Sequence, residues 1–237
     1  MSEEAAEAVT TVERGGDRGR DNRIILGNTG QNVLGLAVGA VATFAAQVVM
    51  TNVLGDQAYG VVTLTTQFAF IAAAATRFGM DVANVRLVAI LVGREQQART
   101  RGLVQRSALI TTAVSIPFAA ASFVLAGSLA ERFSALPDAA RPAFQAAALA
   151  VPVAALAFTY MGATRGLKIM RFTLYSQWIA QPFGWIALTL AAWGVIAKTA
   201  GATTLAYGAS WLLALGIAWY GWRKESDGFP RQLTGAG

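Results

Sequence analysis

The chain has 237 residues, of which 55% are hydrophobic and only 14% are charged, against about 25% charged residues in an ordinary soluble domain. A soluble domain could not cover its surface with so few charges, and a disordered chain would not be this apolar. Cysteine and histidine are both absent, which excludes disulfides, thiolate nucleophiles, Cys/His zinc sites and histidine acid–base chemistry. The composition therefore predicts an integral membrane protein, in which basic loops explain the net charge of +6 without a nucleic-acid partner.

Six long apolar blocks dominate the sequence after a polar amino-terminal segment. Residues 1–23 mix acidic, basic and glycine residues, and we expect a disordered cytoplasmic tail there. Each block is long enough to cross the roughly 30 Å hydrocarbon core as a helix. The predicted spans are about 28–54, 59–78, 107–130, 143–164, 173–197 and 202–222, followed by a second cytoplasmic tail at 223–237. The predicted fold is all-α and polytopic, with a six-helix membrane domain over 24–222.

The positions of the basic residues predict how the spans are oriented in the membrane. All but three of the 19 Lys and Arg residues fall in the two tails, between spans two and three, or between spans four and five. The three exceptions are Arg132, Arg141 and Lys198. Because basic loops stay on the cytoplasmic side, we expect both termini in the cytoplasm.

Spans one and two carry polar or small side chains at helical spacing, which fall on one face of each helix. The stripes comprise Asn28, Asn32, Gly35, Gly39, Thr43 and Gln47 on span one, and Tyr59, Thr63, Gln67, Ala74, Arg77 and Asp81 on span two. Polar groups in a spanning helix face protein or water and avoid lipid, so we expect a hydrated cavity between these spans. The alternative is dry contact between helices, since Gly35 and Gly39 form a small-xxx-small pair.

Later spans carry weaker patterns. Gln177 and Gln181 on span five are spaced one turn apart and are interpreted as hydrogen-bonded interhelical amides. Pro117, Pro152 and Pro182 each favour a kink in their span. Most of the aromatic residues near predicted span ends are interpreted as an interfacial belt: Tyr175, Trp178, Trp193, Tyr207, Trp211, Trp219, Tyr220 and Trp222.

The connection between spans two and three is rich in arginine. We expect the span-two helix to continue past Phe78-Gly79, and a short second helix to carry Arg86. Arg77 and Arg86 lie at the mouth of the polar stripe, where a guanidinium could pair with phosphate or pyrophosphate. For Arg94, Arg99 and Arg101 we favour topology signalling and attraction to anionic lipid heads.

We do not expect the chain to catalyse a covalent reaction. The sequence contains no nucleophile–base arrangement and no glycine-rich ATP loop, and no carboxylate falls inside a predicted span where a coupling ion would need one. We therefore expect a non-enzyme that uses no metal and no cofactor.

Two segments resemble the amino-terminal region of bacterial O-antigen and capsule flippases, in the multidrug/oligosaccharidyl-lipid/polysaccharide exporter superfamily. They are Asn52-Val-Leu-Gly-Asp-Gln-Ala-Tyr-Gly60 and Phe78-Gly-Met-Asp-Val-Ala83, the latter followed by Arg86 and Ala89. The resemblance covers about residues 24–106. It implies a bacterial cytoplasmic-membrane protein with two pseudo-symmetric lobes, alternating access, and flipping of an undecaprenyl-pyrophosphate-linked glycan. This chain supplies six helices. We therefore expect either a truncated or split gene product, or a chain that pairs with a second six-helix lobe or a homo-oligomeric partner.

The sequence predicts a substrate cavity lined by Asn32, Thr43, Gln47, Thr63, Gln67, Arg77, Asp81 and Arg86. The leading hypothesis is one lobe of a lipid-linked oligosaccharide flippase in the lipid bilayer. The alternatives are a drug or cation antiporter of the same superfamily, or a membrane scaffold subunit that does not transport.

Overall fold

A computed structural model describes residue 30, residue 33 and residues 36–229 of the chain, and this part is helical without a strand. The helices are the first helix (Leu36–Leu54), α2 (Asp56–Thr76), α3 (Met80–Gly93), α4 (Gln97–Val124), α5 (Ala126–Phe133), α6 (Pro137–Gly166), α7 (Arg171–Thr173), the π-helix η1 (Leu174–Ala180), α8 (Gln181–Val195) and α9 (Ala200–Ser226). Within the described residues, the first helix, α2, α4, α6 and α9 are each long and apolar enough to cross a membrane. The predicted all-α membrane fold is confirmed.

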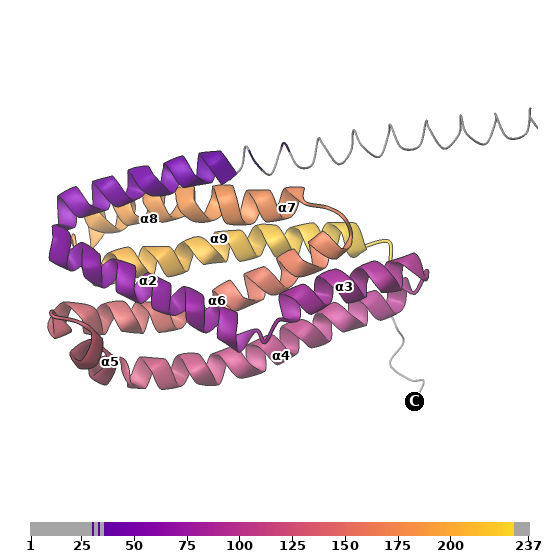
Figure 1. The fold of residues 1–237 in the computed structure, drawn as a ribbon, viewed down its shortest axis with the longest axis horizontal. Helices are drawn as coiled ribbons and strands as arrows, with labels where there is room; N and C mark the ends of the chain where they lie inside the picture. Colours follow the sequence, from indigo (N-terminus) through magenta and orange to yellow (C-terminus); the bar gives the residue numbers. More distant parts are fainter. Residues whose placement is uncertain (1–29, 31–32, 34–35, 230–237) are drawn as a thin grey trace, which may run out of the picture.

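The long helices run side by side in a bundle with α6 at its centre (Figure 1). Helix α6 contacts α2, α3, α4, α5 and α9. Of the residues in its most apolar segment, 72% are buried. Alanines occupy much of its surface, so the backbones of its neighbours can approach closely. At one such contact, a side chain on Gly208 of α9 would meet the Cβ of Ala150 at 3.2 Å.

Helix α2 ends earlier than predicted. The sequence pattern carries its helix past Phe78-Gly79, but α2 stops at Thr76, and α3 begins at Met80. Phe78 and Gly79 both have positive φ, 47° and 70°. Glycine adopts this left-handed geometry at no steric cost, so Gly79 permits the break. Arg86 lies on α3, a helix separate from α2.

The third predicted span divides differently from the expected 107–130. Helix α4 begins at Gln97, inside the expected loop, and ends at Val124. The remaining residues belong to α5, which turns across the end of the bundle (Figure 1). Pro117 and Pro152 lie inside α4 and α6, and both helices are continuous through them.

The fifth predicted span is divided into three consecutive helical segments, the α-helix α7, the π-helix η1 and the α-helix α8. The π-helical segment ends at Ala180, two residues before Pro182. Proline has no N–H, so the regular i→i−4 bond to the Trp178 carbonyl cannot form. A wide π turn is a common way to accommodate such a disruption, and such turns recur at functional sites.

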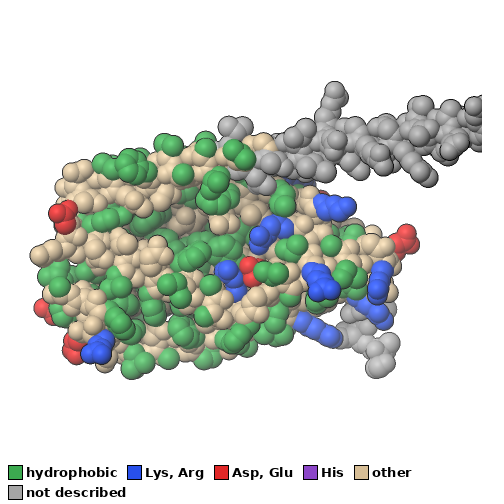
Figure 2. Space-filling view, in the orientation of Figure 1, with side chains coloured by type: hydrophobic (Ala, Val, Ile, Leu, Met, Phe, Trp, Pro, Cys, Tyr) green, Lys and Arg blue, Asp and Glu red, His purple; other side chains and the backbone are tan. Residues whose placement is uncertain are grey.

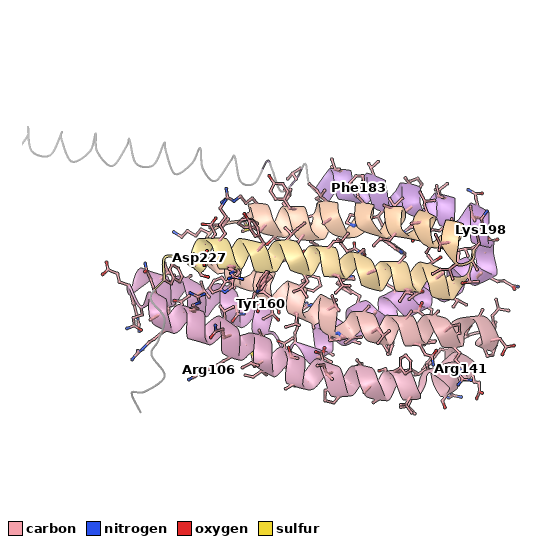
Figure 3. All side chains as sticks on the ribbon, turned by 180° about the vertical axis from the view of Figure 1, so that it is seen from behind. Arg106, Arg141, Tyr160, Phe183, Lys198 and Asp227 are labelled. Atoms are coloured by element: carbon pink, nitrogen blue, oxygen red, sulfur yellow. The ribbon has the colours of Figure 1, made fainter. Side chains whose placement is uncertain are left out.

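The bundle has one strongly basic end. Helix α9 ends there, and α3 lies at the same end (Figure 1). Lys and Arg gather mainly there on the face in Figure 2. From behind, Arg106 and Asp227 mark this end, and Lys198 and Arg141 mark the other (Figure 3). The predicted tail at 223–237 begins later, because α9 continues to Ser226; residues 1–23 and 230–237 lie outside the described part.

Small residues and a buried amide join α3 to α6. A side chain on Gly162 would overlap the backbone of Asp81, and one on Gly166 would lie 2.7 Å from the Cβ of Val88. Asn84, fully buried, donates to the Thr159 carbonyl at 3.2 Å and accepts from Ser107 at 2.8 Å. These contacts fix α3 to the central helix as well as to α4.

Candidate functional site

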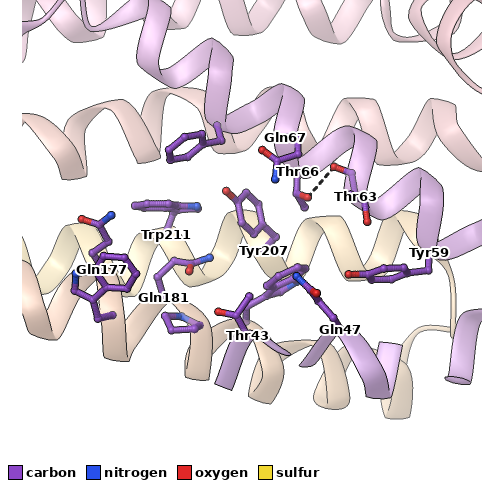
Figure 4. A pocket seen from close by; sticks show the side chains of 14 residues that line it. Thr43, Gln47, Tyr59, Thr63, Thr66, Gln67, Gln177, Gln181, Tyr207 and Trp211 are labelled. Atoms are coloured by element: carbon purple, nitrogen blue, oxygen red, sulfur yellow. Dashed lines mark hydrogen bonds between the residues drawn. The ribbon is translucent and has the colours of Figure 1, made fainter. Parts of the chain in front are cut away.

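A cavity of about 410 Å³ lies between the first helix, α2, the η1–α8 segment and α9 (Figure 4). Its lining is uncharged and combines hydroxyl, amide and aromatic side chains. The lining residues are Thr43, Gln47, Tyr59, Thr63, Thr66, Gln67, Phe70, Gln177, Trp178, Gln181, Pro182, Trp185, Tyr207 and Trp211. Ligand pockets in proteins typically measure roughly 300–1,000 Å³, so the space is large enough for a small ligand or part of a larger one.

The two predicted polar stripes meet in this cavity. Thr43 and Gln47 approach it from the first helix, and Thr63 and Gln67 from α2. Four-residue spacing brings each pair onto one helical face, and the Gly55 turn folds the two helices against each other. Gln47, Thr63 and Gln67 are exposed, and Figure 4 draws no hydrogen bond from either glutamine amide to another lining residue. Asn32 lies outside the described residues.

The opposite wall of the cavity carries residues for which the sequence predicts other roles. Their spacing predicts that Gln177 and Gln181 are bonded interhelical amides, but they line the cavity. Both sit at the π turn, which rotates this part of the helix relative to a regular α-helix. One-turn spacing is visible in the sequence, but it cannot tell a cavity wall from a helix contact.

The aromatic residues follow the predicted belt only in part. Tyr175, Trp219 and Tyr220 are exposed, as belt residues would be, whereas Trp193 and Trp222 are buried. The other three belt residues, Trp178, Tyr207 and Trp211, line the cavity. Sequence position gives the depth of an aromatic residue along a span, but not the direction in which it points.

Trp185 and Tyr207 form a rigid corner of the cavity. Their rings pack edge to face with centroids 5.2 Å apart, and the indole N–H of Trp185 donates to the Thr203 carbonyl at 3.1 Å. Aromatic rings that are held in this way present fixed apolar faces to a ligand.

Part of span one also makes the dry contact that is the alternative hypothesis. A side chain on Gly39 would lie 2.9 Å from the carbonyl oxygen of Trp178, so the first helix touches η1 there. Gly35, its predicted partner, lies outside the described residues. Thr65 of α2 is fully buried and shares a 3.0 Å hydrogen bond with Thr204 of α9. Positions that pack against another helix therefore alternate with positions that line the cavity along these helices.

Arg77 and Asp81, also predicted to line the cavity, lie beyond it. The guanidinium carbon of Arg77 lies 4.3 Å from the ring centroid of Phe158. Phe158 in turn packs against Phe70 and Trp211, with centroids 6.0 Å and 5.0 Å apart. Since Phe70 and Trp211 both line the cavity, these three rings form a layer between the cavity and Arg77.

A compact ionic cluster occupies the other side of this aromatic layer. Arg77 Nε lies 3.2 Å from Asp81 Oδ1, and the two side chains are only 15% and 11% exposed. Arg165 is near enough to interact electrostatically with both. Arg77 Nη1 is buried without a hydrogen-bond partner among the described residues. The cluster contains two guanidiniums and one carboxylate, so it has an excess positive charge.

Arg86, the last predicted site residue, is exposed on α3 and is not part of the cavity lining. Among the described residues there is also no group of three or more Asp or Glu side chains that could hold a metal ion. The structure thus brings together Thr43, Gln47, Thr63 and Gln67, and separates them from Arg77, Asp81 and Arg86.

The described residues thus form a bundle of long apolar helices with an uncharged polar cavity. The chain belongs to the MatE family, whose sequence profile matches residues 34–189. Members of this family are membrane transporters and not enzymes, and the family falls within the exporter superfamily that the sequence resembles. No curated protein and no solved structure matches the chain.

Proposed function

We propose that the chain is one lobe of a two-lobed exporter that moves a lipid-linked oligosaccharide across the bacterial cytoplasmic membrane. The observation that carries the proposal is the uncharged lining of the cavity, with glutamine amides, threonine hydroxyls and rigid aromatic rings. Amides and hydroxyls can exchange hydrogen bonds with sugar hydroxyls. Aromatic faces can pack against the apolar faces of sugar rings.

The same lining argues against the main alternative. A drug or cation antiporter would be favoured by a carboxylate in the cavity wall, and none of the described lining residues is acidic. A scaffold that does not transport would bury its amides in contacts between helices, as Asn84 is buried. Gln47 and Gln67 are instead exposed to the cavity.

The phosphate end of such a substrate needs a cation. Arg77 is our candidate, because its buried Nη1 has no described partner and the cluster with Asp81 and Arg165 has an excess positive charge. Charge-assisted bonds from a guanidinium to phosphate are among the stronger hydrogen bonds in proteins. Arg86, exposed on α3 nearby in the chain, is a second candidate. The aromatic layer of Phe70, Phe158 and Trp211 would have to move before one substrate could reach both regions.

A binding measurement tests this proposal without requiring transport, which needs a second lobe. The full chain in lipid nanodiscs is titrated with a polyprenyl-pyrophosphate-linked oligosaccharide and, separately, with a lipophilic cation. We expect saturable binding of the glycolipid. Gln67→Ala and Gln181→Ala should each weaken it about five-fold, the value of one hydrogen bond of roughly 1 kcal/mol. Binding of the cation alone would contradict the proposal.

A further inference from the structure

A second cavity lies on the outer side of α6, away from the polar cavity. It is a groove of about 680 Å³ with α6 as its floor and α4 and α9 as its walls. The groove-lining residues are Gln105, Ala108, Leu109, Thr112, Leu156, Tyr160, Leu212, Leu215, Gly216 and Trp219. Leu109 and Leu212 are 69% and 57% exposed, so in a membrane this groove faces the acyl chains.

The groove is mostly apolar along its length and has a basic end. Helix α4 runs away from the basic end of the bundle and α9 runs toward it (Figure 1). One turn before Gln105 on α4 is Arg101, and one turn beyond Trp219 on α9 is Arg223. Residues four apart share a helix face, so both arginines continue the two walls of the groove.

Neither arginine is neutralised by a described carboxylate. The ion pairs of the described residues join Arg77 to Asp81 and Arg171 to Glu225. The guanidinium of Arg223 instead lies 5.3 Å from the ring centroid of Trp219, which holds it over the end of the groove. A cation held against an aromatic ring still has donors available for an anion.

We infer that this groove binds an anionic phospholipid, with one acyl chain between α4 and α9 and the phosphate at Arg101 and Arg223. Charge complementarity selects this occupant, because an apolar channel that ends between two unpaired arginines matches an acyl chain joined to an anionic head. Basic pockets between transmembrane helices recognise anionic lipid heads in this way. The inference does not depend on the nature of the transported substrate.

The glycine in the groove wall provides a test that should not disturb folding. A Cβ on Gly216 would meet no atom within 4 Å, so the side chain of Gly216→Phe starts in open space at the groove wall. Gly194 on α8 is also exposed with nothing within 4 Å, and it is not in the groove lining. Gly194→Phe is therefore the matched control.

The experiment measures quenching of tryptophan fluorescence by brominated phospholipids in vesicles that contain the full chain. Trp219→Phe identifies the part of the quenching that arises in the groove. We expect brominated phosphatidylglycerol to compete for the groove better than brominated phosphatidylcholine, by about five-fold for each arginine. Arg101→Ala with Arg223→Ala should abolish this preference, and Gly216→Phe should remove the quenching of Trp219.

Three results would overturn the inference. The first is equal competition by the anionic and zwitterionic lipids. The second is an equal loss of preference in Arg94→Ala, an exposed arginine on the neighbouring α3–α4 turn, because the attraction would then belong to the whole basic end. The third is that no lipid quenches Trp219 and that position 219 of one copy can be cross-linked to a second copy. The groove would then be an interface between chains.

Discussion

The guanidinium of Arg77 stacks on Phe158, 4.3 Å from its ring centroid, and the other contacts of that ring lead to the cavity wall. The charged cluster and the polar cavity are therefore neighbours with an aromatic layer between them. Phe158 contacts both regions, with Arg77 on one side and the cavity-lining residues Phe70 and Trp211 on the other.

The ion pair beside this layer should contribute to stability. Arg77→Ala leaves the Asp81 carboxylate, which is largely buried, without its 3.2 Å partner. We expect a loss of about 1–3 kcal/mol in the free energy of unfolding, measured by denaturation in mixed micelles.

The double variant Arg77→Ala/Asp81→Ala should recover part of that loss, because it no longer buries an unpaired charge. Arg86→Ala, at an exposed position, serves as the control and should leave stability unchanged. A double variant that is as unstable as the sum of its single variants would show that the pair is not coupled.

In a complete two-lobed transporter, Arg77→Ala and Arg86→Ala should each reduce glycan export without reducing the amount of protein in the membrane. The expected cause is the loss of a phosphate partner. Export is followed by surface glycan staining, and membrane content by immunoblotting. Normal export by both variants would remove arginine pairing from the proposed function.

The close approach of α3 to α6 should not tolerate a side chain at Gly162. A Cβ there overlaps the backbone of Asp81, and a backbone cannot move aside as the end of a flexible side chain can. We expect Gly162→Ala to destabilise the bundle by about 1–3 kcal/mol.

Gly60→Ala is the matched control for this substitution, since Gly60 is also helical and a methyl group added to it would meet nothing within 4 Å. Alanine has the higher helix propensity, so this variant should be neutral or more stable by up to about 1 kcal/mol. Equal melting temperatures for the two variants would contradict the close contact.

The charge distribution predicts the orientation of the bundle. Arg94 follows directly after α3, which lies at the basic end (Figure 1). Lys198 lies in the turn between α8 and α9 at the other end (Figure 3). The chain has no native cysteine, so Arg94→Cys and Lys198→Cys can each be labelled alone. We expect an impermeant reagent to reach Lys198→Cys in intact cells, and Arg94→Cys only after the membrane is opened. The opposite pattern would reverse the predicted topology.

Much of the fold can be predicted because a sufficiently long run of apolar residues directly indicates a spanning helix. The run that forms α9 and the stripe of Thr63 and Gln67 are both visible as sequence patterns. The break at Phe78 is not, because a positive φ at phenylalanine depends on tertiary contacts. Gly79 is the available indication, but glycine is also common inside membrane helices.

The site is predictable on one wall and not on the other for a related reason. Helical spacing places Thr43 and Gln47 on one face, but a π turn changes the direction in which the neighbouring side chains point. Gln177 and Gln181 therefore line the cavity from a position where regular spacing indicates an ordinary helix contact. The belt interpretation of Trp211 fails because this residue falls near the middle of the predicted 202–222 span, whereas a belt residue lies at a span end.

The most direct test of the account is the accessibility of two threonines that lie two residues apart on α2. Thr63 lines the cavity, and Thr65 is fully buried against Thr204. In the full chain in membranes, Thr63→Cys should react with an impermeant, water-soluble thiol reagent, as should Thr43→Cys, Gln47→Cys and Gln67→Cys, while Thr65→Cys stays protected. Protection of all four cavity positions would mean that the polar stripe is dry, and would contradict the proposed substrate cavity.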